Sequence, residues 1–140
     1  MQACYRKLTN YKYQLVKGYT MQLDLRPEKL IQTRFIKLDV NGELMIVKEY
    51  AWDGTSGPVI DTNSNMRASL VHDALYQLMR LGKLDYRLHR EYADRIFNEL
   101  CLADGVCRPA AAVYFRFLRT FGEKYARPSG EFEIEEICVP

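Results

Sequence analysis

The sequence lacks the features that mark membrane, secreted or nucleic-acid-binding proteins. No apolar run approaches the roughly 20 residues that a transmembrane helix needs, and the start of the chain has no apolar signal-peptide core. The net charge is only +2, and no dense run of Lys and Arg is present. We therefore expect no transmembrane segment and no nucleic-acid partner, and we expect the protein to stay in the cytoplasm where it is made.

Histidine and cysteine are scarce as well. The four cysteines are accompanied by only two histidines, and the pair Cys101 and Cys107 is separated by five residues. Zinc sites usually use a tighter spacing of two or four residues between cysteines, with further ligands close by. Without a signal peptide the cysteines are expected to remain thiols. The sequence therefore indicates neither a zinc site nor a disulfide framework.

The remaining composition fits one α+β domain over residues 1–140. Of the 140 residues, 48% are hydrophobic and 27% are charged, which is typical of a globular protein. Residues 11–50 are β-rich, residues 63–123 are helical in pattern, and residues 127–140 form a tail that alternates apolar and acidic residues. We expect the tail to add an edge strand or to pack against a partner chain.

The β-rich part should form a small antiparallel sheet or meander. Asn41-Gly42 is its strongest hairpin signal, because a two-residue type I′ turn needs positive φ at both central positions. Pro27 has no N–H to donate and should interrupt the ladder between the second and third strands. The four expected strands are residues 11–16, 19–25, 33–40 and 43–50.

Three helices should follow a glycine-rich loop at residues 52–58. The first is capped by Asn63, Ser64 or Asn65, runs to about Arg80 and stops at Gly82. The second spans about residues 86–103, and the third runs from about residue 108 to 121. The side chains of the third helix expected to cover the other two helices are Val113, Phe117, Leu118 and Phe121.

One group of titratable residues fits the separate roles of a general base, its orienting partner and a cation ligand. His72 and Tyr76 are four residues apart and share a helix face, and Asp94 lies near the edge of the apolar stripe of the second helix. Asp94 can orient His72 through Nδ1, which leaves Nε2 to take a proton from water in a cleft. Asp73 can bind a hard cation together with loop carbonyls around Gly54, an oxygen shell of the kind that calcium prefers.

The same residues also fit a purely structural network. Asp73 can pair with Arg67, Arg80 or Arg90, and Tyr76 can bond Asp94 and so lock two helices together. The motifs themselves do not choose between this interpretation and a catalytic one.

Three motifs in order carry a family resemblance. They are Trp-Asp-Gly-Thr-Ser-Gly-Pro at 52–58, Leu-Val-His-Asp-Ala-Leu-Tyr at 70–76 and Glu-Tyr-Ala-Asp-Arg-Ile-Phe at 91–97. Over about residues 43–122 the chain resembles the DUF1353 family, small proteins found mainly in tailed phages and prophages. That resemblance implies a phage protein in the cytoplasm of the bacterial host or in a virion, with virion proteins as partners. It implies no activity.

The motifs also resemble, more distantly, the phospholipase A2 site in its short parvovirus-capsid form. That site has a glycine-rich calcium loop, then His-Asp-x-x-Tyr on one helix and Ala-Asp-x-x-Phe on the next. The resemblance assigns His72 as general base, Asp94 as its orienting partner, Tyr76 as a hydrogen-bond donor to Asp94, Asp73 as calcium ligand, and Trp52, Gly54 and Ser56 as carbonyl donors. The chain departs from secreted phospholipases in having no cysteine near His72, a loop with fewer glycines, and a β-rich N-terminal part.

Two functional hypotheses follow. The first is a phage-encoded, calcium-dependent hydrolase of the phospholipase A2 type, in which His72 activates water against a lipid ester or a cell-wall amide. The second is a non-catalytic phage structural or assembly protein, in which His72, Asp73, Tyr76 and Asp94 clamp two helices and the acidic tail binds a partner.

Overall fold

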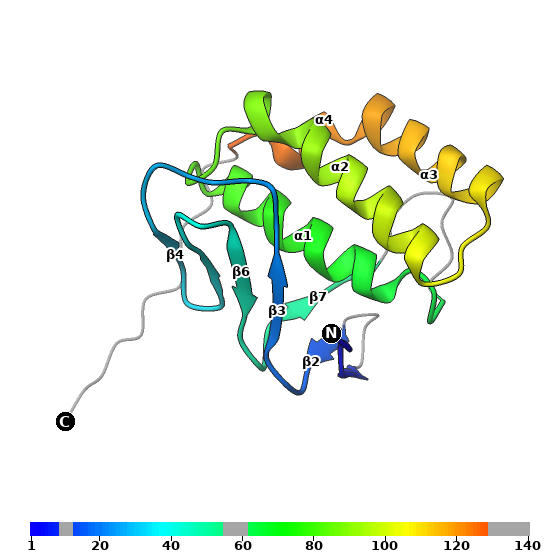
Figure 1. The fold of residues 1–140 in the computed structure, drawn as a ribbon, viewed down its shortest axis with the longest axis horizontal. Helices are drawn as coiled ribbons and strands as arrows, with labels where there is room; N and C mark the ends of the chain where they lie inside the picture. Colours follow the sequence, from blue (N-terminus) through cyan, green and yellow to red (C-terminus); the bar gives the residue numbers. More distant parts are fainter. Residues whose placement is uncertain (9–12, 55–61, 129–140) are drawn as a thin grey trace.

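The computed structural model describes residues 1–8, 13–54 and 62–128. Within them, short strands occupy the N-terminal third and helices follow, which confirms the α+β class (Figure 1). The strands are β1 (Tyr5–Lys7), β2 (Tyr13–Leu15), β3 (Tyr19–Gln22), β4 (Ile31–Gln32), β5 (Ile36–Leu38), β6 (Glu43–Ile46) and β7 (Ala51–Trp52). The helices are α1 (Met66–Arg80), α2 (Tyr86–Ala103), α3 (Arg108–Phe121) and α4 (Glu123–Ala126).

The strands pair antiparallel, as expected, but they form two sheets where the sequence suggested one. One sheet has the order β1-β2-β7 and the other β3-β6-β5-β4. β3 pairs with β6, so the connection that contains Pro27 joins opposite edges of the second sheet and needs no ladder hydrogen bonds of its own. The first residue of the predicted glycine-rich loop, Trp52, instead belongs to β7. It pairs with Tyr13 of β2.

The β5–β6 hairpin is present, but its turn differs from the predicted type I′ turn. Gly42 has a φ of +86°, whereas Asn41 is not among the residues with positive φ. The N–H of Gly42 donates to the Asp39 carbonyl at 3.0 Å, and the Asp39 carboxylate accepts from the N–H groups of Asn41 and Glu43, both at 2.9 Å. These bonds favour a three-residue loop in which only glycine needs positive φ.

We expect Gly42→Ala to destabilise the fold by about 2–4 kcal/mol, from the cost of positive φ for an L-residue plus overpacking. A Cβ at Gly42 would lie 2.5 Å from the Leu23 carbonyl oxygen and 2.9 Å from that of Leu25. Gly82→Ala is the matched control, because Gly82 has a φ of +73° but nothing within 4 Å of an added Cβ. Urea unfolding should show a clearly smaller loss for Gly82→Ala, and equal losses would contradict this explanation.

Helix α1 lies in the middle of the molecule. Most of its residues are buried, and it packs against α2 on one side while one hydrophobic core joins the helices to the strands. Its partly exposed residues are Arg67, Asp73, Gln77 and Arg80, so a narrow polar strip of α1 reaches the surface. The buried polar residues Ser69 and His72 must find partners inside the protein.

Helix α3 places its apolar residues differently from our expectation. Leu118 is buried and Phe117 is partly exposed, but Val113 is 58% exposed and Phe121 is 53% exposed, so neither of the last two covers the other helices. Positions 111 and 118 share the face that packs inward, whereas 113, 117 and 121 follow a second face. The sequence offers two apolar faces, and tertiary packing buries only one. No helix in the described ranges is long and apolar enough to cross a bilayer.

Candidate functional site

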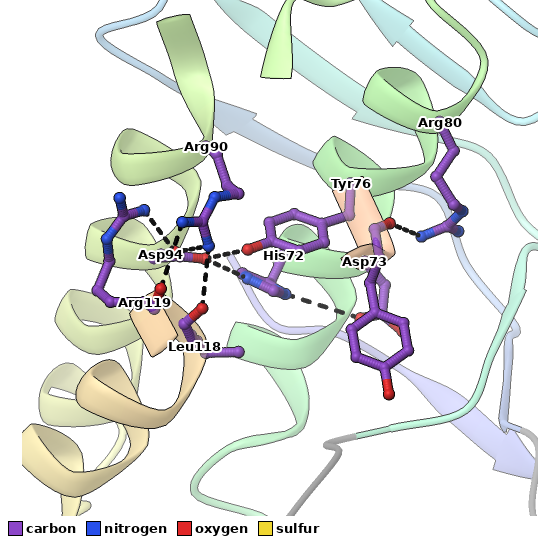
Figure 2. A network of polar contacts seen from close by, with 9 residues as sticks. His72, Asp73, Tyr76, Arg80, Arg90, Asp94, Leu118 and Arg119 are labelled. Atoms are coloured by element: carbon purple, nitrogen blue, oxygen red, sulfur yellow. Dashed lines mark hydrogen bonds and ion pairs between the residues drawn. The ribbon is translucent and has the colours of Figure 1, made fainter. Parts of the chain in front are cut away.

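The carboxylate of Asp94 is fully buried and receives donors from three helices (Figure 2). Its Oδ1 accepts hydrogen bonds from Nε2 of His72 at 2.8 Å and from the hydroxyl of Tyr76 at 2.6 Å, both on α1. Its Oδ2 accepts from Nη1 of Arg119 on α3 at 2.8 Å, with Nη1 of Arg90 on α2 at 3.5 Å. The predicted meeting of His72, Tyr76 and Asp94 is therefore present in the structure.

Arg90 ties this network to the end of α3. It donates from Nη1 to the Leu118 carbonyl at 3.0 Å and from Nη2 to the Arg119 carbonyl at 3.3 Å. The Leu118 carbonyl also accepts from the N–H of Gly122 at 2.8 Å. A cation near the carbonyls in the last turn of a helix complements the helix dipole. Arg90 therefore holds α2 and α3 in register around the Asp94 carboxylate.

Asp94 stays ionised although it is buried. Burial raises the pKa of the Asp94 carboxyl, but its interactions with His72, Tyr76 and Arg119 outweigh burial, and the net pKa lies below its ordinary value. Burial and the Asp94 charge both raise the pKa of the Tyr76 phenol, so its hydroxyl remains a donor. Because Asp94 is an anionic acceptor, Nε2 of His72 carries a proton in this arrangement.

We expect the Asp94 charge to make stability depend on pH. Its contribution is fully present above the ordinary carboxyl pKa of 3.8 and is lost as the pH falls through the lower pKa of the folded protein. The free energy of unfolding of the parent, measured in urea, should therefore fall more steeply between about pH 5 and pH 2 than that of Asp94→Asn, which has no carboxyl to protonate at position 94. Parallel stability curves for the two proteins would show that Asp94 is not the group responsible.

The imidazole of His72 is oriented opposite to our expectation. Nε2, rather than Nδ1, meets Asp94, while Nδ1 faces the Asp73 carboxylate with 3.9 Å between Nδ1 and Oδ1. The ring is held by Tyr76, whose ring centroid lies 4.0 Å away, and by an edge-on contact with Phe97 at 5.4 Å. Burial lowers the pKa of His72, but attraction to Asp73 and Asp94 raises it more, so the net pKa lies above its ordinary value.

His72 is only 6% exposed, yet it borders an open cavity of about 410 Å³. Asp73 lines the same cavity from α1, and Asp53 and Gly54 line it from the segment after β7. The 3.9 Å between Nδ1 and Asp73 is too long for a direct hydrogen bond. In the neutral imidazole the Nδ1 lone pair is therefore available to a water molecule in the cavity.

Aromatic side chains of α3 and α4 form part of the border of the cavity, which Tyr76, Arg80, Leu118 and Gly122 also line. Phe117, Phe121 and Tyr125 line it, and the Phe117 and Phe121 rings lie 5.0 Å apart. Phe121 and Tyr125 are more than half exposed. We call these three residues the aromatic rim; it gives the cavity an apolar approach on the side facing solvent.

The donors around Asp73 fit a hard cation in type. The Asp73 side chain is 33% exposed, and burial raises the pKa of its carboxyl, as does the nearby charge of Asp53. His72 and Arg80 lower that pKa without reversing the shift. Two carboxylates and the Gly54 backbone at one cavity are oxygen donors of the kind that calcium prefers. Within residues 1–8, 13–54 and 62–128, no three His, Cys, Asp or Glu side chains form a metal-binding group.

One of the predicted carbonyl donors, Trp52, stands apart from this cavity. The Trp52 side chain is buried in the core and its Nε1 donates to the Ser69 hydroxyl at 2.9 Å, and Trp52 does not line the cavity. Ser56 lies outside the described residues. Of the predicted loop donors, the structure therefore brings Gly54 to the cavity.

Sequence reasoning did not predict that Arg90 and Arg119 bind Asp94, and it named Arg90 only as a possible partner of Asp73. Arg90 could have been found, because it lies four residues before Asp94 on the same helix, where opposite charges meet. Arg119 comes from another helix, and no local pattern reveals it. Arg67, a suggested partner of Asp73, instead pairs with Asp104 through two hydrogen bonds of 2.9 and 2.8 Å.

Comparison with known proteins adds no relative. No family model, no curated protein and no solved structure matches the chain.

Proposed function

We propose that the protein is a calcium-dependent ester hydrolase of the phospholipase A2 type, with His72 as its general base. The observation that carries the proposal is the orientation of the imidazole. Nε2 is held by the buried Asp94 carboxylate, and Nδ1 faces an open cavity next to the Asp73 carboxylate. A phage origin is part of the proposal and is supported by the motif resemblance alone.

The proposed reaction begins with a water molecule placed between Nδ1 of His72 and the ester carbonyl carbon. Nδ1 takes a proton as the water oxygen bonds to that carbon, and the imidazolium is stabilised by Asp94. The proton then passes from Nδ1 to the leaving alkoxide as the ester C–O bond breaks. Positioned base catalysis of this kind contributes about 10²–10⁴-fold to the rate.

Asp73 and the backbone at Gly54 are the residues proposed to hold calcium, and Asp53 adds negative charge to the same cavity. A bound calcium ion would supply positive charge to the oxyanion that develops on the attacked carbonyl. Asp94 takes no part in binding the cation, because both of its oxygens are occupied by donors.

The aromatic rim favours a lipid ester over a cell-wall amide as the substrate. Phe117, Phe121 and Tyr125 offer apolar surface beside the carboxylates, so an acyl chain could lie on the rim while the ester reaches His72. A cell-wall amide is flanked by polar sugar and peptide groups that gain little from such a surface.

We expect calcium to raise the thermal stability of the parent and not that of Asp73→Asn. A ligand that binds only the folded state at 100 times its dissociation constant adds about 2.7 kcal/mol. Asp24→Asn is the matched control, because it removes an exposed carboxylate that does not line the cavity. Scanning calorimetry of the parent and of both variants, at increasing concentrations of calcium chloride, measures the change in Tm. An unresponsive parent, or an equal response in Asp73→Asn, would contradict the metal assignment.

A second candidate is a non-catalytic structural or assembly protein. The observation that favours it is that Asp94 is fully buried and joins α1, α2 and α3 through His72, Tyr76, Arg90 and Arg119. A satisfied network of this kind fixes helix packing whether or not any chemistry follows. The two candidate functions differ in whether a change at His72 lowers activity or stability alone.

A further inference from the structure

A basic groove lies between α2 and α3, with a volume of about 590 Å³. Arg108, Arg116 and Arg119 line it from α3, and Leu102 and Phe115 add apolar surface. No acidic residue is among the described residues that line it. We call it the arginine groove; it presents positive charge and apolar surface together.

The charges of the arginine groove are only partly neutralised. Arg119 is paired with Asp94. Arg108 and Arg116 are exposed, and no carboxylate in the described part of the chain lies within ion-pair distance of either. Cations held close together on one helix repel one another, so an anionic occupant would lower the energy of the groove.

The chain itself contains a segment of matching chemistry. Residues 131–137 read Glu-Phe-Glu-Ile-Glu-Glu-Ile, which combines four carboxylates with three large apolar side chains. The structure describes the chain as far as Pro128, which lies beside Tyr86 and Arg87 at the start of α2. From there the groove at Asn98 is about 18 Å along α2, at about 1.5 Å per residue. Residues 129–137 can span up to about 30 Å, at about 3.3 Å per residue.

We propose that the arginine groove is the docking site of the acidic segment 131–137 of the same chain. Glutamates of the segment pair with Arg108 and Arg116, and its apolar side chains contact Leu102 and Phe115. Each exposed ion pair is weak, but a short tether holds the segment at an effective concentration of about millimolar. The inference does not rest on hydrolysis, because neither Arg108 nor Arg116 touches the His72 cavity.

The cysteines of the full chain provide a direct test. Cys107 is exposed and precedes Arg108, and Cys138 follows the acidic segment. A short bismaleimide, added to dilute protein, should link Cys107 to Cys138 within one chain, and mass spectrometry of a digest identifies the link. The double variant Arg108→Glu/Arg116→Glu should lower the yield at least five-fold. Lys124→Glu, a single charge reversal on α4 outside the groove, should leave it unchanged.

The outcomes separate docking from chance encounters of the two thiols. Loss of the cross-link in 0.5 M sodium chloride supports docking, because exposed ion pairs are screened. An equal yield in the double variant, with circular dichroism showing that it is folded, would overturn the proposal. A link that forms only between chains and rises with protein concentration would also overturn it, by assigning the groove to a second copy.

Discussion

Asp94→Ala is expected to lower the free energy of unfolding by about 3–5 kcal/mol, the usual cost of breaking a buried ionic network by removing one partner. The loss is large because the carboxylate is the shared acceptor of donors from three helices. Arg90, whose side chain is only 12% exposed, would keep its charge with one anionic partner fewer. The tyrosine hydroxyl and the imidazole would each lose their acceptor as well.

Urea unfolding at neutral pH measures this loss. Asp104→Ala is the matched control, because it breaks the Arg67 pair, whose side chains are 21% and 25% exposed and therefore partly hydrated. We expect that control to lose about 1 kcal/mol or less, as partly exposed pairs do. Similar losses in the two variants would mean that Asp94 is not the centre of the helix packing.

His72→Gln is expected to lower kcat/KM for ester hydrolysis by about 10²–10⁴-fold, the usual contribution of a general base. Glutamine can still donate a hydrogen bond to Asp94, but its amide cannot accept a proton near neutral pH. The fold should therefore be affected much less than by Asp94→Ala. His89→Gln is the control, because it replaces the other histidine of the chain, which lies outside the cavity.

The parent and His72→Gln together separate the two candidate functions. A structural clamp predicts that His72→Gln affects stability alone and that the parent hydrolyses no ester. The hydrolase predicts that activity falls while thermal unfolding changes little. A His72→Gln protein that keeps the full rate of the parent would exclude His72 as the base.

The helices could be predicted closely from the sequence, whereas the strands could be predicted only in part. The four expected segments contain β2, β3, β5 and β6, but β1, β4 and β7 were not expected. The expected second helix coincides with α2, because Asp85 caps its start through the N–H of Arg87 and Gly105 follows its end with positive φ. Strands β4 and β7 have two residues each, too few to show alternation. β7 is defined by its pairing with β2, almost 40 residues earlier in the chain.

The meeting of His72, Tyr76 and Asp94 was predictable because it depends on patterns within single helices. His72 and Tyr76 are one helical turn apart, and the stripe pattern of α2 places Asp94 toward α1. Arg119 was not predictable, since it depends on how α3 rotates against α2. The same rotation explains why Phe121 lies on the aromatic rim instead of in the core. The orientation of the His72 ring depends on contacts with Tyr76 and Phe97, which no sequence pattern specifies.

The most direct test of the central claim measures fatty-acid release from phospholipid vesicles by pH-stat titration, with calcium and with a chelator. The parent and His89→Gln should release acid with calcium and lose that activity in the chelator. His72→Gln should release it at least 100-fold more slowly, as expected for loss of a general base. Equal release by His72→Gln and the parent, or no release by the parent in either condition, would contradict the claim that His72 activates water for ester hydrolysis.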